Sequence, residues 1–133
     1  MRIFAALTLI LFCSSVFSEE ILFEGKTGCW SAIAKPWMNK ITVCLNYDLT
    51  TISVYYPNKT EKNSWAPTLC TAAGNVKYLS KNKFNLENQK GSCKNGRGFE
   101  QPSLECEEIS QDTMHCIIPN STTDLLIFNK AGI

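Results

Sequence analysis

The sequence predicts an all-β fold, or a β-rich fold with a minor helix, built as a small disulfide-stapled sandwich or barrel. Three observations support this prediction. Apolar and polar residues alternate in several short segments, turn-forming residues separate those segments, and the 133-residue chain carries seven cysteines. Alternation with a period of two turns one set of side chains toward a core and the other toward solvent. Cysteines at this density are typical of small disulfide scaffolds.

A hairpin in the first half of the chain is the clearest element. Residues 41–45 alternate apolar and polar side chains, residues 51–56 do so again, and turn formers lie between them. Further strands are predicted at residues 76–79, 104–107, 114–118 and 125–128.

Breakers separate these predicted strands at residues 57–58, 74–75, 95–98 and 119–120. Two segments lack a clear β pattern. Residues 31–34 could hold a helical turn that Pro36 ends, and the polar residues 81–89 could form a loop or a short helix. Short strands with this punctuation favour a sandwich or a barrel.

Residues 1–18 form a predicted secretory signal peptide. Arg2 precedes an apolar run over residues 3–12, and the small residues Val16 and Ser18 precede the expected cleavage site. The run is too short to span about 30 Å of hydrocarbon at about 1.5 Å per residue. We therefore expect a secreted, extracellular protein without a transmembrane span, in which residues 19–133 form a single disulfide-rich β domain.

Removal of the signal peptide makes the cysteine count even. Cys13 lies in the removed segment, and six cysteines stay in the mature chain. An even count without a CxxC pair indicates a disulfide framework rather than a zinc site or a redox motif. Six cysteines allow fifteen pairings, and the sequence does not choose among them. The predicted framework consists of Cys29, Cys44, Cys70, Cys93, Cys106 and Cys116.

Charge is balanced overall but uneven along the chain. Loss of Arg2 leaves 12 basic and 12 acidic residues. Residues 40–98 hold nine lysines and arginines against three acids, whereas residues 99–133 hold one lysine against six acids. A neutral chain of this kind has a dipole but no strong overall field, so nucleic acid is not expected as a partner.

No catalytic constellation is visible, and we expect a protein that is not an enzyme. His115 is the only histidine, and strand alternation turns it away from the side that Cys116 faces. Glu105 and Glu107 share one face of a predicted strand, which a paired-carboxylate mechanism could use, although a solvated strand face is the simpler interpretation. We expect no metal site, no calcium loop and no cofactor.

Surface residues suggest glycosylation and binding. Asn58 and Asn120 each begin an Asn-x-Ser/Thr sequon in a predicted turn, where a glycan is tolerated. Trp65 lies in a predicted loop, and a loop tryptophan either packs back on the fold or contacts a partner. The predicted binding residues are Trp65, Lys81, Lys83 and Arg97, with Trp37 a further candidate.

Gly28 and Trp30 are spaced as in the Gly-x-Trp pattern of the lipocalins, which this tripeptide resembles. The resemblance implies a carrier of a lipophilic ligand, although about 115 residues are few for an eight-stranded calyx. Three functions stay open: a secreted protein that recognises an extracellular protein or glycan through its loops, a small lipocalin-like carrier, and a small secreted hydrolase or hydrolase inhibitor. A carrier would need an apolar cavity lined by Tyr47, Tyr55, Tyr56 and Phe128.

Overall fold

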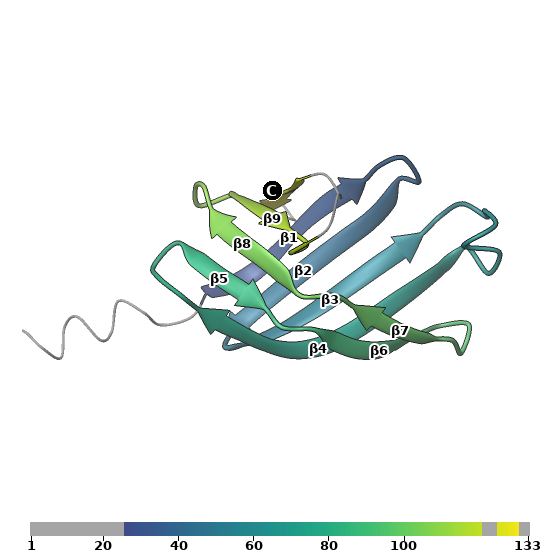
Figure 1. Cartoon of the computed structure of the whole chain (residues 1–133), viewed down its shortest axis with the longest axis horizontal. Coiled ribbons are helices and arrows are strands. Elements are labelled where there is room, and N and C mark those ends of the chain that lie inside the picture. The colour runs from purple at the N-terminus through teal and green to yellow at the C-terminus, as the bar shows by residue number, and fades with distance from the viewer. Residues whose placement is uncertain (1–25, 121–124, 131–133) are drawn as a thin grey trace, which may run out of the picture.

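The structure is a computed structural model that describes residues 26–120 and 125–130. Within these ranges the chain forms ten β-strands and no helix (Figure 1). The predicted signal peptide, residues 1–18, lies outside the described residues. The strands are β1 (Lys26–Ala34), β2 (Asn39–Tyr47), β3 (Leu49–Tyr56), β4 (Thr68–Tyr78), β5 (Lys83–Leu86), β6 (Gln89–Cys93), β7 (Gly98–Gln101), β8 (Leu104–Glu108), β9 (Thr113–Ile117) and β10 (Leu126–Lys130).

Eight of the strands close into an antiparallel barrel. Their order around the barrel is β1, β2, β3, β4, β5, β8, β9 and β10, and β10 pairs with β1 to complete the ring. The prediction of a β sandwich or barrel is confirmed, and the structure selects the barrel. The short chain is sufficient because several connections are tight: Asp48 alone joins β2 to β3. Tight hairpins leave most residues for strands.

The extra strands β6 and β7 continue a hairpin that begins in the barrel. The pairs Lys83↔Glu107 and Gln89↔Gln101 belong to one register, so β5–β6 and β7–β8 are two interrupted arms of the same hairpin. The β5–β8 half completes the barrel. The β6–β7 half pairs with the first residues of β4 and enlarges that side of the sheet (Figure 1).

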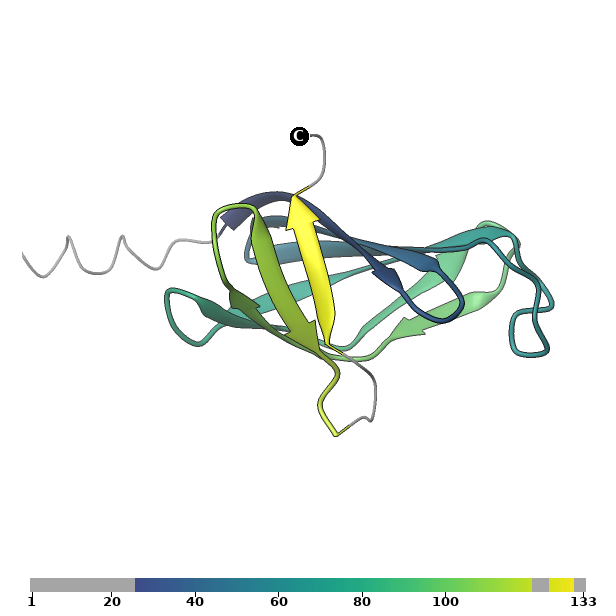
Figure 2. The same cartoon turned by 90° about the horizontal axis from the view of Figure 1, so that it is seen from above.

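Alternating strand directions give the barrel two distinct ends. The closed end carries the start of β1 and the turns after β2, β4 and β8. The open end carries the connections at residues 35–38, 57–67 and 94–97, together with residues 118–120 after β9. Seen from above, the β9–β10 side and the large β1–β4 sheet diverge toward the open end (Figure 2).

Large apolar side chains fill the barrel. Phe84, Leu86, Leu104 and Phe128 are buried completely or nearly so. Near the closed end, a cavity of about 10 Å³ lies between Trp30, Leu45, Phe84 and Met114 and the charged groups of Lys26 and Glu108. A volume of this size holds about one water molecule.

Trp30 packs across the closed end of the barrel. A methyl group added at Gly28 would lie 3.2 Å from the Trp30 ring, so the glycine leaves room for the indole. Gly28 also has a φ of +133°, which an L side chain rarely adopts. Lys130 on β10 places Nζ 5.9 Å from the centre of the Trp30 ring. The Gly-x-Trp spacing therefore has a packing reason in this chain.

Three disulfides join residues that lie directly opposite each other on neighbouring strands. Cys29–Cys44 links β1 to β2, Cys70–Cys93 links β4 to β6, and Cys106–Cys116 links β8 to β9. All six cysteines of the predicted framework are paired. The last two bridges are buried, whereas the first lies on the outer face of its sheet.

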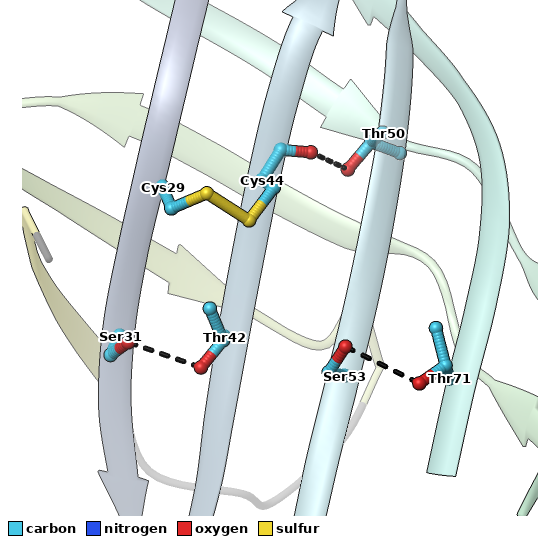
Figure 3. Close-up of a disulfide and its surroundings, with 7 residues drawn as sticks. All are labelled: Cys29, Ser31, Thr42, Cys44, Thr50, Ser53 and Thr71. Carbon is cyan, nitrogen blue, oxygen red and sulfur yellow. Dashed lines mark hydrogen bonds between the residues drawn. A yellow bond between two sulfur atoms is a disulfide. The ribbon is translucent and has the colours of Figure 1, made fainter.

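Hydroxyl groups surround that outer bridge (Figure 3). Ser31 and Thr42 lie on opposing strands with their oxygens 3.1 Å apart, and the Ser53 and Thr71 oxygens are 3.4 Å apart. Thr50 Oγ1 donates to the Cys44 carbonyl at 3.1 Å. The outer wall is therefore polar around this bridge, whereas nearer the open end Ile33 and Tyr55 are exposed on the same wall.

Two segments without a clear β pattern in the sequence are part of strands. Residues 31–34 belong to β1 rather than to a helical turn, because Trp30 and Ala32 face the core as a strand requires. Residues 81–89 contain β5 and the start of β6, where Phe84 and Leu86 alternate inward between polar neighbours. Two apolar residues are too few to reveal that period in a polar segment.

Strand β4 is much longer than the predicted segment 76–79. It begins at Thr68 and runs through Gly74 and Asn75, which the sequence suggested as a breaker. At Gly74 the missing side chain makes room for a neighbour, since an added Cβ would lie 2.5 Å from Gln89 Cγ. The glycine thus serves close packing within a strand rather than a turn.

Candidate functional site

The structure separates the predicted binding residues into two groups. Trp65 and Arg97 lie at the open end, in the connections before β4 and after β6. Lys81 lies in the turn after β4 and Lys83 starts β5, both at the closed end. The eleven residues of β4 separate the groups by about 33 Å at the usual rise per residue. A single compact site cannot contain all four side chains.

Trp65 is half-buried at the open end and contacts two neighbours. Its ring meets Tyr56 edge-on, with centroids 4.7 Å apart and an interplanar angle of 75°. Arg97 Cζ lies 5.8 Å from the centre of the Trp65 ring. Aromatic edge contacts and cation–π contacts both have this geometry. The three side chains form the aromatic–arginine cluster, named here for Tyr56, Trp65 and Arg97.

Local hydrogen bonds shape the two connections that carry this cluster. In the loop before β4, Thr60 Oγ1 accepts from the Asn63 amide at 3.0 Å, and Asn63 O accepts from the Ala66 amide at 3.0 Å. In the turn after β6, Asn95 Oδ1 accepts from the Arg97 amide at 3.0 Å. Side-chain bonds of this kind fix turns without a core. Trp65 and Arg97 are thus presented by ordered backbone.

Sequence reasoning missed the role of Tyr56 beside Trp65. The alternation of β3 places Ile52, Val54 and Tyr56 on the inner face, so the inward direction of Tyr56 could have been found. The loop at residues 57–67, which brings Trp65 next to Tyr56, has no such alternation, so this contact could not be predicted. Burial raises the pKa of the Tyr56 hydroxyl above its ordinary value, because desolvation disfavours the phenolate.

The β1–β2 connection adds a second tryptophan to the open end. Trp37 and Met38 are exposed. Asn58 Nδ2, from the neighbouring loop, donates to the Trp37 carbonyl at 3.1 Å. Asn58 and Asn120 are both exposed, as a glycosylation site must be. Glycan attachment at these residues stays a prediction.

Basic side chains gather around the open end. The described connections at this end, together with Lys40 near the start of β2, contain six basic residues and a single acid, Glu61. Several lysines on one surface attract acidic partners and speed their encounter. These basic residues are Lys35, Lys40, Lys59, Lys62, Lys94 and Arg97.

The closed end carries both signs of charge. Lys26 forms an ion pair with Glu108, and its backbone amide donates to Tyr78 Oη at 2.9 Å. Partial burial lowers the pKa of Lys26, and the nearby charge of Lys81 lowers it further. Asp48 and Asp112 lie in turns at the same end. The basic character of the open end is therefore not shared by the other end.

His115 lies on the outer wall, on the face opposite to Cys116, as the alternation of its strand predicts. It is directly across from Glu107, while Glu105 is across from Ile117. Glu105 and Glu107 do share one strand face. Within residues 26–120 and 125–130, no group of three histidine, cysteine or acidic side chains is arranged to hold a metal ion.

The aromatic residues suggested for a ligand cavity do not line a common space. Phe128 is inside the barrel, whereas Tyr47 and Tyr55 are exposed on its surface. Tyr56 belongs to the aromatic–arginine cluster at the open end. The mouth of a barrel is nevertheless a common position for a binding site, and here the open end holds that position.

No helix in the described part of the chain is long and apolar enough to cross a membrane. Comparisons of the chain with protein-family models, with curated proteins and with solved structures find no match.

Proposed function

We propose that this protein is a secreted binding protein whose open end recognises an acidic extracellular partner, either a protein or a glycan. The observation that carries the proposal is the aromatic–arginine cluster set among lysines. Trp65 and Arg97 come from different connections and meet on an ordered surface. Aromatic and arginine side chains dominate binding hot spots, and surrounding lysines contribute mainly to encounter and salt dependence. The proposal assigns no catalytic step to the chain.

Substitution of Trp65 tests this proposal. Trp65→Ala should weaken binding to the partner by about 2 kcal/mol or more, because it removes the largest side chain of the cluster. The partner is first captured from extracellular fluid on the immobilised protein, and its affinity is then measured by titration calorimetry. The matched control is Tyr47→Ala, which removes an exposed aromatic at the closed end.

Thermal melting of the same variants separates binding from folding. A Trp65→Ala variant that melts normally and still binds normally contradicts the proposal. A variant that loses about 3–5 kcal/mol of stability, while its folded fraction binds normally, would identify Trp65 as a core residue instead.

Charge reversal distinguishes the two ends of the barrel. Lys59→Glu with Lys94→Glu should slow association and reduce its dependence on salt, because both lysines lie at the open end. Lys81→Glu with Lys83→Glu should leave a compact partner unaffected. Slower association with the second pair would indicate a partner that extends along the whole barrel.

A second candidate function is a small lipocalin-like carrier. The closed eight-stranded barrel with Trp30 across one end supports it. Ligand pockets usually measure about 300–1,000 Å³, whereas core side chains fill this barrel and leave about 10 Å³ near the closed end. A carrier would therefore need the Trp65 loop and part of the core to move. Displacement of a fluorescent fatty acid by candidate lipids would test this function.

A further inference from the structure

A group of exposed aliphatic side chains lies on the outer wall at β9 and β10. Ile117 on β9 is 41% exposed, Leu125 before β10 is 48% exposed, and Ile127 on β10 is 51% exposed. Ile127 is directly across from His115, and Leu126 is across from Cys116. Leu125 therefore lies beside Ile117 in the same register. These three residues form the side patch, in contrast to the hydroxyl-rich surroundings of the Cys29–Cys44 bridge (Figure 3).

Carboxylates border the side patch. A shallow depression of about 260 Å³ is lined by Ile117 and Leu125, and Glu105 and Glu107 line it from β8. His115 and Lys83 complete the border. Large exposed aliphatic side chains with a charged rim are typical of interaction surfaces. Lys83 is directly across from Glu107, whereas Glu105 is across from Asn85, so the border keeps more carboxylates than lysines. An apolar partner that carries positive charge fits this surface.

The β1–β2 tip of the same protein, residues 35–40, has that chemistry. Trp37 and Met38 are each 47% exposed and lie next to each other at the turn. Lys35 and Lys40 flank them, and the tip contains no acid. The hydrogen bond from Asn58 to the Trp37 carbonyl holds the tip against the next loop. The tip therefore presents two apolar side chains between two cations.

The tip does not reach the side patch of its own chain. Among the described residues, β1 pairs with β10 as far as Ser31, and beyond it the β1–β2 hairpin extends away from β10 (Figures 1 and 2). Both surfaces stay exposed in one copy, as the fractions above show. Each is free to meet its complement on another molecule.

We propose that the β1–β2 tip of one copy docks on the side patch of a second copy. Trp37 and Met38 cover the aliphatic side chains, while Lys35 and Lys40 approach Glu105 and Glu107. The two surfaces differ, so the contact is heterologous, and a pair of copies keeps one free tip and one free patch. Copies therefore associate tip to patch and form short linear oligomers, whose length increases with concentration.

The expected affinity is modest. A contact through two tip residues and three patch residues is smaller than a standard interface, and such contacts are weak and transient. A dissociation constant on the order of 0.1 mM is expected. Salt at about 1 M, where the screening length falls to about 3 Å, should weaken the charged part of the contact.

Sedimentation equilibrium of the mature secreted chain tests the proposal. The chain is produced without N-glycans, because a glycan on Asn58 would stand beside the tip and its removal by an amidase would convert Asn58 to aspartate and remove the donor to the Trp37 carbonyl. The weight-average mass should rise above that of the monomer as the concentration approaches about 1 mM, and it should fall again at high salt. A monomeric mass over the whole range overturns the proposal.

Two single variants then identify the surfaces. Trp37→Ala removes the tip contact and Ile127→Asn removes the patch contact, so each variant alone should be monomeric. Mixed together, they should form one-to-one dimers and nothing larger, because each keeps one competent surface. Variants that still associate alone, or a mixture that stays monomeric, contradict the heterologous contact.

Leu79→Asn is the matched control, since Leu79 is 57% exposed in the turn at the closed end. This variant should associate as the unmodified chain does. An equal loss with Leu79→Asn would mean that general surface hydrophobicity causes the association, and it would overturn the specific contact. The assay contains no other partner, so its outcome is independent of the function proposed for Trp65.

Discussion

At the level of single residues, Gln89 on β6 is almost completely buried, and its side-chain amide has no hydrogen-bond partner among the described residues. Its alkyl stem packs against Gly74, where no other residue type leaves enough room. A buried amide without a partner keeps the full cost of its desolvation, about 1–3 kcal/mol. Gln89 therefore makes the fold less stable than an apolar residue of the same shape would.

Gln89→Met should increase the free energy of unfolding by about 1 kcal/mol or more. Methionine keeps the unbranched shape that fits beside Gly74 and removes both unsatisfied polar atoms. Urea denaturation of the two proteins measures the difference. The matched control is Gln101→Met on β7, which removes a bond donated to the Pro102 carbonyl at 3.3 Å and should bring no gain. A loss of stability with Gln89→Met would show that this amide is hydrogen-bonded in solution.

At the level of elements, one disulfide and a short backbone pairing join the β6–β7 hairpin to β4. Its first strand is fixed to β4 by Cys70–Cys93, and the turn that follows carries Arg97. The bridge joins residues 23 positions apart, and loops of this size contribute about 3 kcal/mol by limiting the unfolded chain. Stability and the position of Arg97 are thus linked through the same element.

Replacement of Cys70 and Cys93 by alanine should therefore affect both stability and binding. We expect a loss of about 3 kcal/mol or more, together with weaker partner binding, because Arg97 is no longer held over Trp65. Replacement of Cys29 and Cys44 by serine is the control, since that bridge lies on the outer face and far from the cluster. Its loss should lower stability without an effect on the affinity of the folded protein. Denaturant titration and calorimetry measure the two quantities.

At the level of the whole molecule, much of the barrel could be predicted but its two ends could not. Alternation located β2, β3, β8, β9 and β10, because each has apolar residues at every second position. Small and polar residues occupy the first half of β4 and most of β6, and β5 has only Phe84 and Leu86 as apolar residues, so these segments lack that signal. Trp65 and Lys81 are both predicted binding residues, but β4 runs unbroken through Gly74 and places them at opposite ends of the barrel.

The sequence predicts which six cysteines form disulfides, but it does not predict how they pair. Each bridge depends on which strands become neighbours and in which register, and local alternation does not encode either. The clustering of lysines has the same origin. They come from separate connections, and the antiparallel pairing of β1 to β4 with β6 and β7 brings these connections to one end.

The narrow join between β1 and β10 has a mechanical consequence. Among the described residues it consists of the pairs Trp30↔Lys130 and Ser31↔Asn129, whereas β1 and β2 share nine pairs. All three disulfides tie other strand pairs, so no covalent bond crosses this join. Small fluctuations should therefore separate β1 from β10 more easily than β1 from β2. In hydrogen–deuterium exchange, amides of β10 should exchange faster than those of β2; equal protection of the two strands would mean that the ring opens only when the whole protein unfolds.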